Sequence, residues 1–162
     1  MSIKVSESVV DLDAILNRLG YNDSQINEMM QYDVFLLPND LESPESYFVD
    51  KSVKVKNEIA KKLRIAVITR QGAKSHYQAQ RAAEIVLPVL VFLGWQAFDI
   101  GKDILASTIY DMYVRYRYRG RVPNAKLRCV VVDKKRQIRK ELEAEGPAND
   151  LAKILREFKL AS

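Results

Sequence analysis

The sequence predicts an α+β domain in which a small mixed sheet is covered by helices. Two short apolar runs typical of buried strands lie at residues 34–37 and 64–69, with helical spacing between them. Residues 127–132 then alternate before a charged turn at Asp133, which predicts a hairpin that continues through 138–142. A strand–helix–strand unit and a C-terminal hairpin form one sheet when helices cover its apolar face.

The length and composition of the chain fit one soluble domain. The chain has 162 residues, of which 48% are hydrophobic and 29% charged, a composition that excludes disorder throughout. The one cysteine, Cys129, excludes an internal disulfide and fits a reducing compartment. The first ten residues lack the apolar core of a signal peptide, so we expect a cytoplasmic protein, with a peripheral membrane location left open.

Residues 1–33 are predicted to form an acidic helical hairpin beside a single α/β domain over 34–162. Leu12, Leu16 and Leu19 recur at helical spacing, and Gly20 follows as a C-terminal cap. A second helix is expected to begin at Asn22 or just after it, where side-chain oxygens are available for capping.

Residues 44–63 admit two interpretations. Phe48, Val55 and Ile59 lie on one stripe at helical spacing, and Ser43-Pro44 is a suitable helix start. The valines of this segment also favour extended structure, so a helix is preferred and a hairpin stays open.

A long helical insertion is predicted over 76–118, beginning near Ser75 and divided or kinked at Pro88. Its residues 85–98 are fourteen in number, carry no formal charge and include Trp95. A membrane-spanning helix needs about 20 apolar residues. This run therefore indicates a buried helix, a re-entrant turn or an in-plane anchor, with an apolar interface expected at Val89, Phe92, Trp95 and Phe98.

The last forty residues predict a hairpin and a terminal helix that opens at Gly146-Pro147 and carries Leu151 and Leu155 on its apolar stripe. The layout of 33–160 resembles the effector-associated constant components of bacterial conflict systems. The strand RIAVIT, the apolar insertion and the ending VVVDKKRQIRKELEAEGPANDLAKIL carry this resemblance. It implies an α/β unit interrupted by apolar helices and a non-enzymatic partner of an immune effector, and it transfers no catalytic residue.

Charge is divided unevenly along the chain. Residues 1–50 have a net charge of −8 and residues 51–162 a net charge of +13. Three explanations remain open: neutralisation within the fold, self-association, or a basic surface for an acidic partner. Arginines alternate with tyrosines after Met112, a mixture that suits single-stranded nucleic acid, anionic lipid or a solvated helix end. The expected anion-binding residues are Arg115, Arg117, Arg119, Arg121, Lys134, Lys135 and Arg136.

The sequence contains no recognisable catalytic or metal-binding motif. Ile68 and Ala73 occupy the glycine positions of a phosphate-binding loop that would end at Lys74-Ser75. His76 is the one histidine and is too far from Cys129 for metal-ligand spacing. Asp99 and Asp103 lie one helical turn apart, beside Lys102, which favours an ion-paired surface.

The sequence therefore predicts no catalytic residue, no metal and no cofactor. It favours a non-catalytic adaptor that binds a protein partner or other copies of itself. A peripheral membrane protein and a nucleic-acid-binding module are the alternatives.

Overall fold

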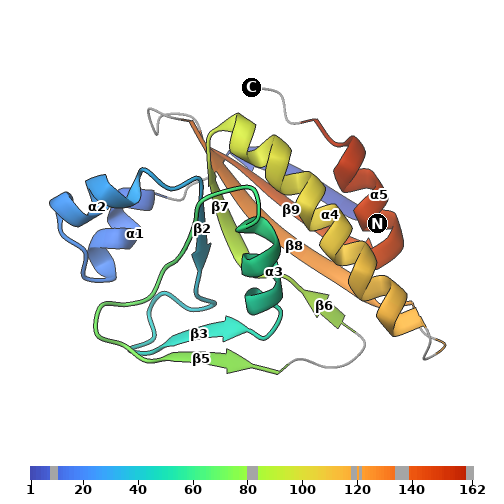
Figure 1. Ribbon diagram of the computed structural model, residues 1–162, viewed down its shortest axis with the longest axis horizontal. Helices are drawn as coiled ribbons and strands as arrows, with labels where there is room; N and C mark the ends of the chain where they lie inside the picture. The colour runs from blue at the N-terminus through green and yellow to red at the C-terminus, as the bar shows by residue number, and fades with distance from the viewer. Residues whose placement is uncertain (8–10, 80–83, 118–119, 121, 134–138, 160–162) are drawn as a thin grey trace.

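The computed structural model describes residues 1–7, 11–79, 84–117, 120, 122–133 and 139–159, and it confirms the α+β class. A mixed sheet forms the centre of the molecule (Figure 1). Its strand order is β1 (Ser2–Glu7), β9 (Arg139–Pro147), β8 (Asn124–Val132), β7 (Val89–Leu93), β2 (Val34–Leu37) and β4 (Ile65–Val67). The short strand β6 (Glu84–Val86) also pairs with β8, and β3 (Ser46–Val49) pairs with β5 (Ser75–Gln78) in a separate parallel ribbon.

Helices cover both faces of the sheet. Val34 and Leu36 belong to a core shared with α3 (Ser52–Ile59), α4 (Trp95–Arg117) and α5 (Ala148–Glu157). Phe35 and Leu37, which alternate with them, belong to a second core shared with α1 (Leu12–Arg18) and α2 (Asp23–Met29). Because neighbouring residues of a strand point to opposite faces, β2 is buried on both sides, which explains its continuous apolar run.

The same two-sided burial explains why the predicted helix over residues 85–98 was wrong for its first part. This run forms β6 and β7, and the helix begins only at Trp95. Leu90 and Phe92 face the core under α4, whereas Val91 faces the core under α1. A central strand needs apolar residues at every position, and over so short a run that pattern cannot be distinguished from a buried helix.

Pro88 marks a shift of strand register and does not kink a helix. Val86 pairs with Lys126 on β8, and Leu90 pairs with Cys129, so the three residues between Val86 and Leu90 match only two residues of β8. The extra residue lies in the segment that contains Pro88, whose nitrogen has no proton for a ladder hydrogen bond. Gly94 then turns the chain from β7 into α4 with a φ of 108°, a conformation that favours glycine.

Helices α1 and α2 confirm the predicted N-terminal pair. Asn22 is the N-cap of α2, where its side chain accepts from the amide of Gln25 at 2.8 Å, and the Gln25 side chain accepts from the amide of Asn22 at 2.9 Å. The prediction of a helical hairpin over residues 1–33 missed a strand at residues 2–7. These residues form β1, and every one of them pairs with a residue of β9. The alternation of Ile3 and Val5 with polar residues was the signal for this strand.

Residues 44–63 combine the two structures that the sequence left open. Strand β3 comes first and is followed by α3, whose Val55 and Ile59 are fully buried. The helix predicted to start near Ser75 is instead strand β5. Its His76 contacts the Glu45 carboxylate at 2.5 Å, and its ring stacks on Tyr47 with centroids 5.0 Å apart.

The C-terminal hairpin and α5 form as predicted, with β8 and β9 paired from Asn124 opposite Pro147 to Val132 opposite Arg139. Lys134 and Lys135, which were predicted to turn the chain after Asp133, and Ile138, which was predicted in the second strand, lie outside the described residues. Helix α5 is attached to α4 by Lys102, which is 8% exposed and donates from its Nζ to the Arg156 carbonyl oxygen at 2.8 Å. A cation at the C-terminal end of α5 also suits the helix dipole.

Candidate binding surfaces

The predicted apolar interface does not lie on the surface as a unit. Phe92 and Phe98 are buried in the core and contact each other edge to face, with ring centroids 5.7 Å apart. Val89 and Trp95 are half-buried, and the Lys140 ammonium lies 5.7 Å from the centroid of the Trp95 ring. The pairing of β7 between β2 and β8 places Phe92 inside the monomer, and Phe98 packs there from α4, which sequence spacing alone did not reveal.

Of the predicted anion-binding residues, the structure describes Arg115 and Arg117, and both are exposed in the last turns of α4. The other five lie outside the described residues: Arg119, Arg121, Lys134, Lys135 and Arg136.

Arg115 contributes to a basic pocket that the sequence analysis did not identify, because its other cations come from a segment more than sixty residues earlier. Lys51, Lys54, Met112, Arg115 and Tyr116 line this hollow of about 250 Å³ between the start of α3 and the end of α4. We call it the α3–α4 basic pocket. Contacts between the two helices bring three cations together here, and none of the described lining residues is a carboxylate.

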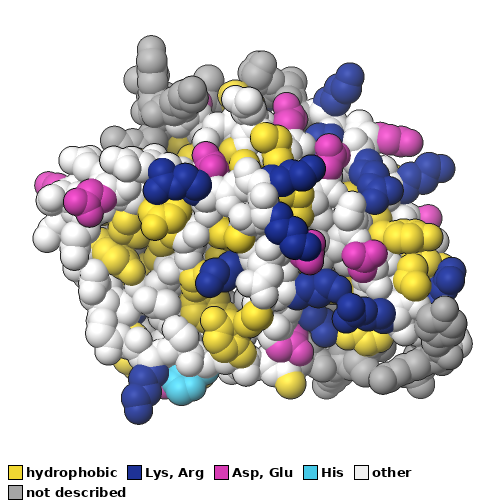
Figure 2. Space-filling view, viewed as in Figure 1, with side chains coloured by type: hydrophobic (Ala, Val, Ile, Leu, Met, Phe, Trp, Pro, Cys, Tyr) yellow, Lys and Arg dark blue, Asp and Glu magenta, His cyan; other side chains and the backbone are white. Residues whose placement is uncertain are grey.

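Two further features make this pocket electropositive. The first turn of α3 has no side-chain cap on its amides, so the positive end of the helix dipole lies beside the lysines. Figure 2 shows lysine and arginine side chains gathered over the region between α3 and the C-terminal part of α4. One ion pair offsets part of this charge, since a carboxylate oxygen of Asp50 lies 3.8 Å from the Nζ of Lys51.

The tyrosines of α4 are engaged within the protein. Lys51 donates from Nζ to the Tyr116 hydroxyl at 2.8 Å and lies 5.4 Å from the centroid of its ring. Tyr113 packs against the core and contacts Tyr110, with ring centroids 5.8 Å apart. Tyr110 remains 43% exposed. Tyr118 lies outside the described residues, and the described tyrosines of this segment do not present a row of open aromatic faces.

The basic residues of β8 are neutralised by β9. Arg128 forms ion pairs with Glu141 and, at 3.9 Å, with Glu143. Lys126 lies 4.0 Å from Glu145, to which Asn124 also donates at 3.1 Å. Antiparallel pairing of the two strands sets these residues opposite each other, so the basic run of the sequence becomes a mixed-charge surface.

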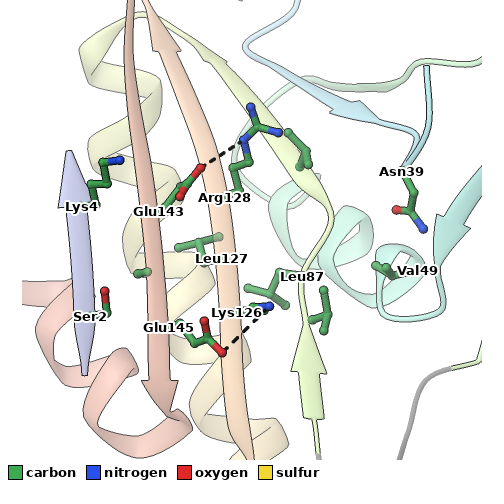
Figure 3. Close-up of a pocket in the computed structure, with 13 residues that line it drawn as sticks. Ser2, Lys4, Asn39, Val49, Leu87, Lys126, Leu127, Arg128, Glu143 and Glu145 are labelled. Carbon is green, nitrogen blue, oxygen red and sulfur yellow. Dashed lines mark ion pairs between the residues drawn. The ribbon is translucent and has the colours of Figure 1, made fainter. Parts of the chain in front are cut away.

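This mixed-charge surface forms one wall of the larger hollow in Figure 3, which has a volume of about 470 Å³. Ser2 and Lys4 of β1 lie along one side, while Asn39 and Val49 lie across the gap from the sheet. Leu87 and Val89 supply an apolar part. Lys126 and Arg128 are paired with carboxylates of β9, so most of the charge in this hollow is balanced, in contrast to the α3–α4 basic pocket.

The carboxylates of α4 and the Cys129 thiol do not line either of the two hollows described above. Asp99, Asp103 and Asp111 are exposed on α4, and Lys102 approaches Asp103 to 3.7 Å. Burial, with a smaller contribution from Glu141, raises the pKa of the Cys129 thiol from 9.0 to about 12. Within the described ranges, no group of three or more His, Cys, Asp or Glu side chains is placed to hold a metal ion.

Comparison with protein-family models, with curated proteins and with solved structures gave no match for this chain. In the part of the chain that the structure describes, no helix has both the length and the apolar character needed to cross a bilayer.

Proposed function

We propose that the protein is a non-catalytic interaction module that binds an acidic surface of a protein partner at the α3–α4 basic pocket. The observation that carries this proposal is the convergence of Lys51, Lys54 and Arg115 on one hollow without a lining carboxylate. Cations held close together attract an acidic ligand more strongly than the same charges dispersed, and they speed its association.

The alternatives are less well supported by the same residues. Binding of single strands would use open aromatic faces, and Tyr116 is occupied by Lys51. A membrane anchor at residues 85–98 would need its large apolar side chains exposed, and Phe92 and Phe98 lie in the core. The acidic helices α1 and α2 pack on the opposite face of the sheet from the pocket, so their carboxylates leave its charge available.

The layout resemblance to effector-associated constant components suggests which partner to try first. An adaptor of that kind would hold an immune effector through its charged surface and perform no chemistry itself. Cytoplasmic location remains part of this proposal.

Three polyanions separate the classes of partner. A poly-glutamate peptide, a single-stranded oligonucleotide and vesicles that contain phosphatidylserine are titrated separately against the protein at low and moderate salt. We expect poly-glutamate to bind with an affinity that falls as salt rises. Binding of the oligonucleotide or the vesicles alone would replace the proposal with one of the alternatives, and binding of none would contradict it.

A further inference from the structure

We propose that a second copy of this chain binds along β1, antiparallel to it, so that two sheets join across a two-fold axis. This inference is independent of the α3–α4 basic pocket, because it rests on the opposite end of the sheet.

The first observation is that β1 forms an edge. It pairs with β9 on one side, and no described strand pairs with its other side. A strand at an edge directs alternate N–H and C=O groups outward, where another extended segment is their best protein partner. The outward N–H and C=O groups of β1 are therefore best satisfied by another β-strand.

The second observation is the chemistry of the two faces of β1. Ile3 and Val5 pair with Ala144 and Leu142, so they lie on the sheet face that carries α5. They are nevertheless 37% and 43% exposed, and Met1 is 52% exposed. The alternate residues are polar, and two of them, Ser2 and Lys4, line the hollow of Figure 3. This edge thus presents one apolar row and one polar row.

Helix α5 extends the apolar row. Arg156 donates to Ser107 of α4 at 3.1 Å, which fixes the flank of α5 that faces α4. Ile154 of α5 and Phe158, its C-cap residue, are four positions apart, lie away from Arg156 by helical spacing, and are both half-buried. A partner paired along β1 would cover these two side chains as well. That contribution is needed because stable interfaces bury about 1,200 Å² or more in total, which a short strand alone does not supply.

The strand is complementary to itself, which points to a second copy as its partner. A two-fold axis perpendicular to the sheet keeps like faces together, so apolar residues meet apolar residues. With Ile3 opposite its own equivalent, Met1 lies opposite Val5 of the partner subunit and Ser2 opposite Lys4 of the partner subunit. Moving the axis by one residue toward the C-terminus would set Lys4 against its own equivalent, which is destabilising. Moving it by one residue toward the N-terminus would set Ser2 against its own equivalent and would no longer pair Met1 with Val5. We therefore expect the register centred on Ile3.

Cysteine cross-linking tests both the contact and its register. The natural Cys129 is buried, so an Ile3→Cys variant introduces a single accessible thiol. Directly opposite residues of an antiparallel pair have Cα atoms about 4.5–5.5 Å apart, within the range that a disulfide bridges. Mild oxidation should convert most of the Ile3→Cys protein to a covalent dimer. A matched Val53→Cys variant, at a position 47% exposed on α3, should not form the covalent dimer. No dimer, or equal dimer from both variants, would overturn the proposal.

Solution mass provides the second test. We expect light scattering to give twice the monomer mass for the natural chain and for a Val53→Lys/Tyr110→Lys control, whose sites are 47% and 43% exposed. An Ile3→Lys/Val5→Lys variant should give the monomer mass while its circular dichroism is unchanged. A natural chain that remains monomeric at high micromolar concentration would contradict the inference. If the double variant does not fold, the cross-linking result decides.

Discussion

The backbone of Gly101 in α4 lies directly against the ring of Phe92 in β7. A Cβ atom added to Gly101 would stand 2.2 Å from Cε1 of Phe92, well inside van der Waals contact. This contact sets how closely the long helix approaches the central strand. It also explains why a glycine is placed in the middle of a helix, where its conformational freedom is unfavourable.

Replacing Gly101 by alanine should therefore destabilise the protein. Helix propensity alone would favour alanine by about 1 kcal/mol. Overpacking a fixed core costs about 1–3 kcal/mol and acts against the aromatic ring, so we expect a net loss in the free energy of unfolding in urea. Gly101→Ala combined with Phe92→Leu should recover part of that loss. A more stable Gly101→Ala variant would show that the contact is not constraining.

Lys102 should contribute to stability through its bond to α5. In Lys102→Met the Arg156 carbonyl loses its donor, and an unsatisfied polar group of this kind costs about 1–3 kcal/mol. Chemical denaturation measures the change. Lys153→Met, at an exposed position of α5, serves as the control and should change stability by less than about 0.5 kcal/mol. Equal stability of the two variants would argue against an anchoring role for Lys102.

Cys129 should make stability fall in alkaline solution. Its pKa is about 12 in the folded state against 9.0 ordinarily, so below pH 9 both states keep the proton and no dependence arises. Above pH 9 the unfolded thiol loses its proton while the folded thiol keeps it, which favours unfolding by up to about 1.4 kcal/mol per pH unit. The stability of the natural chain relative to Cys129→Ala should decline between pH 9 and 10.5. If the stabilities of the two proteins changed in parallel with pH, the raised pKa of the buried Cys129 thiol would be contradicted.

Much of the fold follows from local sequence. The run Val34–Leu37, the capping residues around Asn22 and the alternation that begins at Leu127 each determine one element within a few residues. These signals are local because the element and its apolar face lie in one continuous segment. The helix over Leu105, Ile109 and Met112 is predictable for the same reason.

The remaining elements depend on partners distant in the chain. Strand β7 is apolar throughout because it lies between β2 and β8. The sequence of residues 85–98 alone does not indicate that two other strands flank it. Strand β5 is held by parallel pairing with β3, which is almost thirty residues earlier. The α3–α4 basic pocket also depends on residues distant in the chain. Arg115 was predicted to bind anions, whereas Lys51 and Lys54 approach it only through the packing of α3 on α4.

The proposed role of the α3–α4 basic pocket is tested most directly by calorimetric titration of poly-glutamate into charge-reversed proteins. Lys54→Glu/Arg115→Glu reverses two cations of the pocket, and Lys62→Glu/Lys153→Glu reverses two exposed lysines elsewhere with the same change in net charge. If the pocket is the binding site, the first variant should lose affinity by about tenfold or more, equal to about 1.4 kcal/mol, while the second stays close to the natural chain. Equal losses in both variants would mean that net charge alone attracts the ligand, and would contradict a specific site between α3 and α4.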